Sequence, residues 1–110
     1  MEEVKTPKDF FEKILPEKFN PEKAEGVDVI VNINISGDNG GKWIVIIKNQ
    51  LLEIKNGIHN CPTLSLTIKE KDYLDIINGK LSSEKAFFSG KLKLKGNIMQ
   101  ALRLKDAGLF

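Results

Sequence analysis

The feature that most constrains this chain is the run from Val27 to Ser36, in which every odd position is valine or isoleucine. Successive side chains of a β-strand point to opposite faces, so these residues share one apolar face. A glycine-rich turn follows at residues 37–41, and the next segment, KWIVIIK at residues 42–48, is apolar on both faces. We therefore expect a β-hairpin whose second strand is central in a sheet or covered on two sides.

Three later segments are also typical of strands. Residues 51–55 form a shorter, more polar run that ends at Asn56-Gly57, a dipeptide common in tight turns. Leucine and isoleucine alternate with polar residues over residues 64–68, and lysine alternates with leucine over residues 91–95. Together with the hairpin, these segments predict five strands, of which the first three form a meander.

Helical spacing flanks and separates the strands. Thr6 is a suitable N-cap for a helix that begins at Pro7 and carries an apolar stripe until Pro16 ends it. Further helices are expected over residues 70–78, over residues 82–88 and from residue 98 onward. The order of these elements predicts an α+β domain in which helices are layered on one sheet.

Length and composition indicate one soluble domain. A chain of 110 residues is long enough for a single hydrophobic core, so we expect one domain over residues 1–110. The 17 basic and 15 acidic residues leave a net charge of +2, which does not predict a polyanionic partner. The single Cys61 cannot form an internal disulfide, and neither a secretory signal nor a membrane-length apolar run occurs. We therefore expect a cytoplasmic location.

The sequence offers little for catalysis or metal binding. The only histidine, His59, lies two residues before the only cysteine, Cys61, and such a pair in a loop seldom meets in catalytic geometry. A structural zinc site needs about four cysteine or histidine ligands, which this chain does not have. We therefore expect no enzyme activity, no metal and no cofactor.

A basic segment near the C-terminus raises the alternative of nucleic-acid binding. No acidic residue interrupts the basic residues of this segment, which are Lys91, Lys93, Lys95, Arg103 and Lys105. On a strand, however, the three lysines share one face, and no aromatic side chain alternates with them to stack on bases. Lysines that protect a strand from edge-to-edge pairing explain the same pattern, so we expect no nucleic-acid partner.

The expected helices carry many large apolar side chains for their short length. These residues are Phe10, Phe11, Ile14, Leu15, Phe19, Ile76, Ile77, Leu81, Phe87, Phe88, Ile98, Met99 and Leu102. A filled core and a hollow one both need an apolar lining, so the pattern alone does not distinguish them. Both interpretations stay open on the residues alone.

Six short segments of the carboxy-terminal half form a distinctive series: CPTLSLT at residues 61–67, DYL at 72–74, GKL at 79–81, AFFSGKLKL at 86–94, GN at 96–97 and ALRL at 101–104. In the order and spacing of these segments, the chain resembles the sterol carrier protein 2 family of small lipid-binding domains, also called non-specific lipid-transfer proteins. A leading helix with paired phenylalanines and the strand KWIV at residues 42–45 also fit the family. The resemblance therefore spans nearly the whole chain.

The resemblance implies a mostly antiparallel, five-stranded sheet covered by helices that enclose an apolar cavity. It also implies intracellular lipid binding or transfer without catalysis. The richness in lysine, isoleucine and asparagine, together with the lack of the tail found in animal members, suggests a stand-alone microbial member of the family. The ligand would be a fatty acyl chain, an acyl-CoA, an isoprenoid or a sterol-like molecule, with transient contact to a membrane surface. The alternative is an accessory module with a filled core, including densely packed Phe88, Leu94 and Leu102, that acts through a protein partner.

The resemblance also suggests which residues line the cavity. One set of candidates is Ile77, Leu81, Phe87, Phe88, Leu92, Leu94, Ile98, Met99 and Leu102, and an opposing wall would comprise Phe10, Phe11, Ile14 and Leu15. Met99 is flexible enough to adapt to ligands of different shape. Gln100 and Arg103 are candidates for polar groups near the mouth of the cavity.

Overall fold

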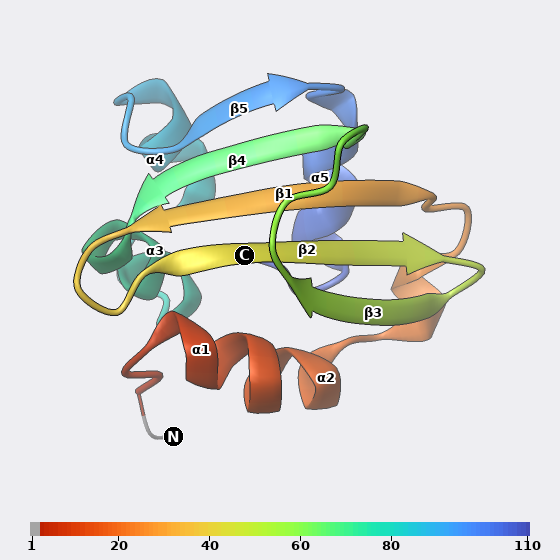
Figure 1. The fold of residues 1–110 in the computed structure, drawn as a ribbon, viewed down its shortest axis with the longest axis horizontal. Coiled ribbons are helices and arrows are strands. Elements are labelled where there is room, and N and C mark those ends of the chain that lie inside the picture. Colours follow the sequence, from red (N-terminus) through yellow and green to blue (C-terminus); the bar gives the residue numbers. More distant parts are fainter. Residues whose placement is uncertain (1–2) are drawn as a thin grey trace.

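The computed structural model describes residues 3–110, and a five-stranded sheet forms its centre (Figure 1). The strands are β1 (Val29–Ser36), β2 (Gly41–Lys48), β3 (Leu51–Asn56), β4 (Leu64–Lys69) and β5 (Lys93–Gly96). They are arranged in the order β3-β2-β1-β4-β5. Only the pairing of β1 with β4 is parallel among the described strands. The predicted meander and the mostly antiparallel sheet are confirmed.

Helices pack against one face of this sheet, as the α+β class requires. A continuous helical stretch comprises α1 (Pro7–Asp9), the π-helical segment Phe10–Ile14 and α2 (Leu15–Lys18), and a 3-10 turn at Pro21–Ala24 precedes β1. The later helices are α3 (Glu70–Ile77), α4 (Ser83–Phe88) and α5 (Met99–Asp106). Within residues 3–110, no helix has the length and apolar character needed to cross a membrane.

The first helical stretch continues through Pro16, so the prediction that it ends there is wrong. A proline in a regular helix collides with the carbonyl group four residues before it. Here the N–H of Leu15 donates to the carbonyl of Phe10, five residues earlier, which widens the turn before the proline. Pro16 then lies in the first turn of α2, where its missing N–H is not needed.

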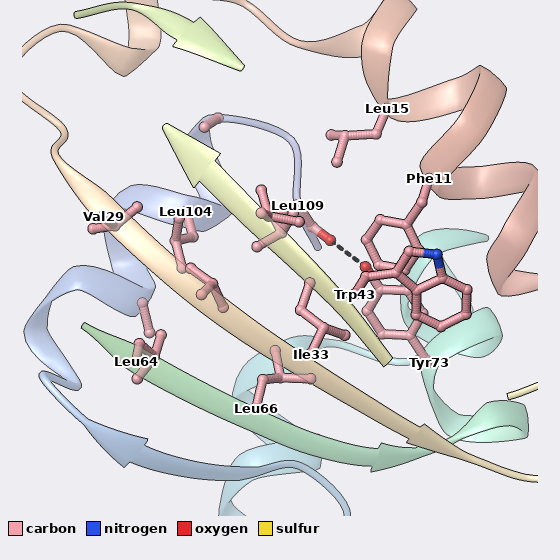
Figure 2. Close-up of a cluster of buried hydrophobic side chains, with 14 of the residues drawn as sticks. Phe11, Leu15, Val29, Ile33, Trp43, Leu64, Leu66, Tyr73, Leu104 and Leu109 are labelled. Carbon is pink, nitrogen blue, oxygen red and sulfur yellow. Dashed lines mark hydrogen bonds between the residues drawn. The ribbon is translucent and has the colours of Figure 1, made fainter. Parts of the chain in front are cut away.

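The hydrophobic core lies between the sheet and the helices (Figure 2). The odd-numbered residues of β1, from Val29 to Ile35, are all buried, as their alternation predicts. They meet buried residues of β2 and β4, among them Trp43 and Leu66, and the C-terminal Leu109. The apolar pattern of the strands therefore specifies which face of the sheet the helices cover.

Aromatic stacking fastens the first helical stretch to the sheet and to α3. The ring of Phe11 stacks on Trp43 with centroids 4.8 Å apart, and on Tyr73 with centroids 5.8 Å apart. The hydroxyl of Tyr73 donates to the carbonyl oxygen of Leu109 at 2.8 Å in a buried hydrogen bond (Figure 2). Burial raises the pKa of Tyr73 well above its ordinary value, so the hydroxyl stays neutral and holds the C-terminal segment against α3.

The connection between β3 and β4 crosses the opposite face of the sheet (Figure 1). Its residue Thr63 exchanges hydrogen bonds with the backbone of Ile30, and His59 bonds to the side chain of Asn32. Asn32 is consequently buried although it lies on the polar face of β1. Ile44 of β2 is also buried on this face, which agrees with the prediction that this strand is covered on two sides.

Candidate functional site

An apolar groove lies at the β5 edge of the sheet, between β5 and the helices α4 and α5. It has a volume of about 250 Å³. Its lining residues are Ser83, Glu84, Phe87, Phe88, Leu92, Leu94, Ile98, Met99, Ala101, Leu102, Lys105 and Phe110. All but Ser83, Glu84 and Lys105 are apolar, so the groove suits an apolar ligand that carries few polar groups.

Helix α4 contributes two phenylalanines to the groove, and hydrogen bonds hold both of its ends in place. The side chain of Ser82 caps its N-terminus, and Ala86 is completely buried. The N–H groups of residues 91 and 92 both donate to the carbonyl oxygen of Ala86, at 2.9 and 3.0 Å, and turn the chain back toward the sheet. Phe87 and Phe88 lie at the end of this fixed helix, with their ring centroids 5.6 Å apart.

Strand β5 presents leucine to the groove and lysine to solvent. Leu94 lies opposite Leu66 in the antiparallel pairing with β4, so its side chain is on the core side of the sheet. Leu92, which directly precedes β5, is buried. Lys93 and Lys95 are exposed, because alternate residues of a strand point to opposite faces.

Helix α5 supplies the remaining wall through residues spaced one turn apart. Ala101 and Leu104 are buried and join the core. Met99 and Leu102, three residues apart, lie on a different side of the helix and line the groove. Ile98, at the start of the helix, lines it as well.

The groove is open to solvent, and its rim is unusually apolar. The exposed fraction is 85% for Phe88, 78% for Met99 and 63% for Leu102. Large apolar side chains gathered at the surface mark a site that another molecule covers. The accessory-module alternative requires Phe88 and Leu102 to be densely packed, so their exposure does not favour it.

One ion pair forms the polar edge of the groove. The ammonium group of Lys105 donates a hydrogen bond to a carboxylate oxygen of Glu84. This hydrogen bond is the main reason that the pKa of Glu84 lies below its ordinary value. Both groups reach solvent, so the pair contributes little to stability and can open for a ligand.

The structure brings only some of the predicted lining residues into this groove. Those that line it are Phe87, Phe88, Leu92, Leu94, Ile98, Met99 and Leu102. Phe10, Phe11 and Leu15 are instead buried in the core. Ile14 and Ile77 border a separate depression, together with Phe10, and Leu81 packs half-buried against the core. The predicted lining residues near the N-terminus therefore lie outside this groove.

The polar residues of the groove also differ from the prediction. Neither Gln100 nor Arg103 lines it, and Arg103 donates to the carbonyl oxygen of Glu25 at 2.8 Å, which ties α5 to the segment before β1. Lys105 follows Leu102 by three residues, and that helical spacing could have indicated it. Phe110 lines the groove through tertiary packing, for which the sequence gives no local signal.

His59 and Cys61 lie outside the groove, in the connection between β3 and β4. The backbone N–H of Cys61 donates to Nδ1 of His59 at 3.0 Å, so one ring nitrogen is already occupied. Within residues 3–110, no three histidine, cysteine or acidic side chains gather closely enough to hold a metal ion.

The fold and the groove define an α+β domain that presents an apolar hollow at one edge of its sheet. The chain belongs to the SCP-2 sterol transfer family, whose model matches residues 10–107. The family resemblance carried by the sequence segments is therefore confirmed, together with the α+β fold that it implies.

Curated relatives match this chain over a small part of their own length. Hydroxysteroid dehydrogenase-like protein 2 of Rattus norvegicus is 28% identical over 94 residues, which are 84% of this chain and 18% of the relative. Peroxisomal multifunctional enzyme A of Dictyostelium discoideum is 35% identical over 85 residues, with coverages of 76% and 19%. Sterol carrier protein 2 of Homo sapiens is 33% identical over 73 residues, with coverages of 64% and 13%.

Solved structures show the same fold. The sterol carrier protein domain 2 of Helicoverpa armigera has a TM-score of 0.71 and 28% identity, covering 96% of this chain and 91% of its own. Palmitated SCP2L2 of Aedes aegypti has a TM-score of 0.62 and 24% identity, with coverages of 84% and 89%. The inverting sec-alkylsulfatase of a Pseudomonas species has a TM-score of 0.75 and 22% identity, with coverages of 94% and 16%.

Proposed function

We propose that this chain binds and transfers lipids by reversible burial of an apolar chain in the groove between α4, β5 and α5. The ligand class comprises fatty acyl chains, acyl-CoA, isoprenoids and sterol-like molecules. The observation that carries the proposal is the gathering of exposed Phe88, Met99 and Leu102 around one hollow in a member of this family. These side chains gain free energy when a lipid removes them from water.

The driving force is hydrophobic burial of both the ligand and the groove. Each buried methylene contributes roughly 0.8 kcal/mol, so the part of an acyl chain that the groove covers supplies a favourable gross free energy. Few polar groups line the groove, so we expect selectivity to be broad. Lys105 is the only cation in the described lining, and it can pair with a ligand carboxylate in place of Glu84.

The proposal assigns residues 1–110 to one lipid-binding domain that works in the cytoplasm, without catalysis and without a nucleic-acid partner. The lining of the groove supports a binding role, because nine of its residues are apolar and its polar residues are limited to Ser83 and the paired Glu84 and Lys105. The palmitated relative from Aedes aegypti supports an acyl ligand. Transient contact with a membrane is part of this proposal, because a carried lipid must be taken from a donor.

Displacement of a fluorescent fatty acid by palmitate tests the proposal. We expect Leu102→Gln to weaken binding of the probe roughly tenfold, because it places a polar group in the apolar lining. Leu51→Gln is the matched control, because Leu51 is 70% exposed on β3 and lies outside the groove, so probe binding should be unchanged. If the unaltered protein neither binds the probe nor carries any lipid in a native mass spectrum, the proposed function is wrong.

A further inference from the structure

The apolar rim of the groove lies within the most basic part of the chain. From residue 85 to residue 105 there is no acidic residue, and the basic residues are Lys85, Lys91, Lys93, Lys95, Arg103 and Lys105. Five large hydrophobic side chains of the same segment are exposed: Phe87, Phe88, Ile98, Met99 and Leu102. We call this combination of exposed apolar and basic side chains the β5 surface.

The elements that carry the β5 surface lie together at one side of the molecule. Figure 1 shows β5 along an edge of the sheet, with α4 near one of its ends and α5 behind the other. The side chains of Lys93 and Lys95 extend from this edge strand on the face of the sheet opposite to Leu94, which lines the groove. Cationic side chains therefore lie along one side of the β5 edge, and the apolar rim lies along the other.

Few acidic groups oppose this positive charge. Glu84 is paired with Lys105, and Asp106 follows at the end of α5. On the other side of β5, Asp72 shares a depression with Lys91 and Lys93 and with a further cation, Lys69. The six basic residues of the β5 surface therefore outnumber these three carboxylates, Glu84, Asp106 and Asp72.

We propose that the β5 surface docks on an anionic lipid bilayer. Phe88 and Met99 enter the interface between headgroups and acyl chains, while Lys91, Lys93 and Lys95 lie over the lipid phosphates. An exposed apolar face bordered by lysine is the combination that binds anionic membrane surfaces. A second copy of this chain is disfavoured as the occupant, because two such surfaces would bring like charges together.

Docking in this orientation turns the mouth of the groove toward the bilayer. Phe88, Met99 and Leu102 belong both to the rim and to the lining, so a lipid could pass between membrane and groove without crossing water. This consequence rests on the proposed function, whereas the docking itself rests only on the charge and exposure of the β5 surface.

Co-sedimentation with vesicles tests the docking. We expect the protein to bind vesicles of phosphatidylcholine with an equal part of phosphatidylglycerol and to bind phosphatidylcholine vesicles much more weakly. Replacing Lys91, Lys93 and Lys95 by glutamine should reduce partitioning onto the anionic vesicles by roughly a hundredfold, because each lysine near such a surface contributes about 1 kcal/mol. Phe88→Ser should reduce it by roughly tenfold.

A matched triple variant distinguishes docking through the β5 surface from attraction by the overall charge of the protein. Glutamine at Lys8, Lys23 and Lys48 removes the same charge from exposed positions outside the β5 surface, and we expect it to leave partitioning within about twofold of the unaltered protein. Equal losses in the two triple variants would overturn the proposal, as would equal binding to neutral and anionic vesicles. A dimer in sedimentation analysis that Phe88→Ser dissociates, without vesicle binding, would assign the surface to a second copy.

The triple variant at Lys91, Lys93 and Lys95 also separates this proposal from the proposed function. These lysines do not line the groove, so binding of the fluorescent fatty acid in the absence of vesicles should be unchanged. Docking without fatty-acid binding would contradict the proposed function alone, and fatty-acid binding without docking would contradict the β5 surface alone.

Discussion

Asn32 and Asn34 lie two positions apart on the same face of β1, yet their side chains have different surroundings. Asn32 donates through Nδ2 to the carbonyl oxygen of His59 and accepts from the His59 N–H through Oδ1, both at 2.9 Å. The Oδ1 atom of Asn34 is buried without a hydrogen-bond partner among the described residues. The side chain of Asn32 therefore anchors the connection between β3 and β4 through two hydrogen bonds, and the side chain of Asn34 does not.

This difference predicts unequal effects of two matched substitutions. Asn32→Ala removes both hydrogen bonds and leaves the backbone of His59 without these partners, so we expect it to lower the free energy of unfolding by about 2 to 3 kcal/mol. Asn34→Ala removes an unpaired atom and should change that free energy by less than about 1 kcal/mol. Urea denaturation measures both values, and an equal loss in the two variants would contradict the role of Asn32 as the anchor of this connection.

Residue patterns predicted the polarity of these positions but could not predict which of them another segment of the chain would bury. The alternation in β1 correctly assigns Asn32 to the polar face, whereas its burial depends on a connection that ends near Thr63. The same limit applies to Phe11, which the sequence presents as an apolar helix residue. Whether such a residue borders a ligand or stacks on Trp43 depends on contacts between distant segments, which periodicity does not encode.

Among the elements, β5 has two glycines near its ends, and they meet different structural requirements. Gly90 and Gly96 both have positive φ angles, of 83° and 108°, which favour glycine. A Cβ atom at Gly90 would have open space around it. A Cβ atom at Gly96 would lie 2.5 Å from the backbone oxygen of Thr63, because β4 begins directly beside it.

Alanine substitutions should separate backbone conformation from close approach. Gly90→Ala meets only the cost of positive φ, about 1 kcal/mol. Gly96→Ala adds a collision with backbone that cannot rotate away, so we expect a loss of about 3 kcal/mol or more, together with weaker fatty-acid binding because β5 moves from α5. Thermal unfolding and probe binding check this order, and a Gly90→Ala variant that is the less stable of the two would contradict it.

Elements with a clear period or cap were predictable, and those that depend on pairing partners were not. The Ser82 cap of α4 and the alternation of β1 give local signals, and the structure contains both features. The parallel contact of β1 with β4 has no such signal, because it joins segments separated by two other strands. The continuation of the first helical stretch through Pro16 needs a widened turn, which propensity alone does not indicate.

At the scale of the whole molecule, the two ends of the helical layer differ in packing. Near the first helical stretch and α3, Phe11, Trp43 and Tyr73 fill the space beneath the sheet. Near β5, the short helices α4 and α5 leave a groove whose rim reaches solvent. The sequence supplied the candidates for both ends, and only the tertiary structure separates core residues from groove residues.

The central claim is that a lipid occupies the groove between α4, β5 and α5. Methyl-group NMR during titration with palmitate tests it most directly, because methyl signals report on each wall separately. We predict that the signals of Leu94, Met99 and Leu102 shift as palmitate binds, while those of Leu15 and Leu51 stay unchanged. Signals that do not move at saturating palmitate, or shifts confined to the core around Leu15, would contradict the account.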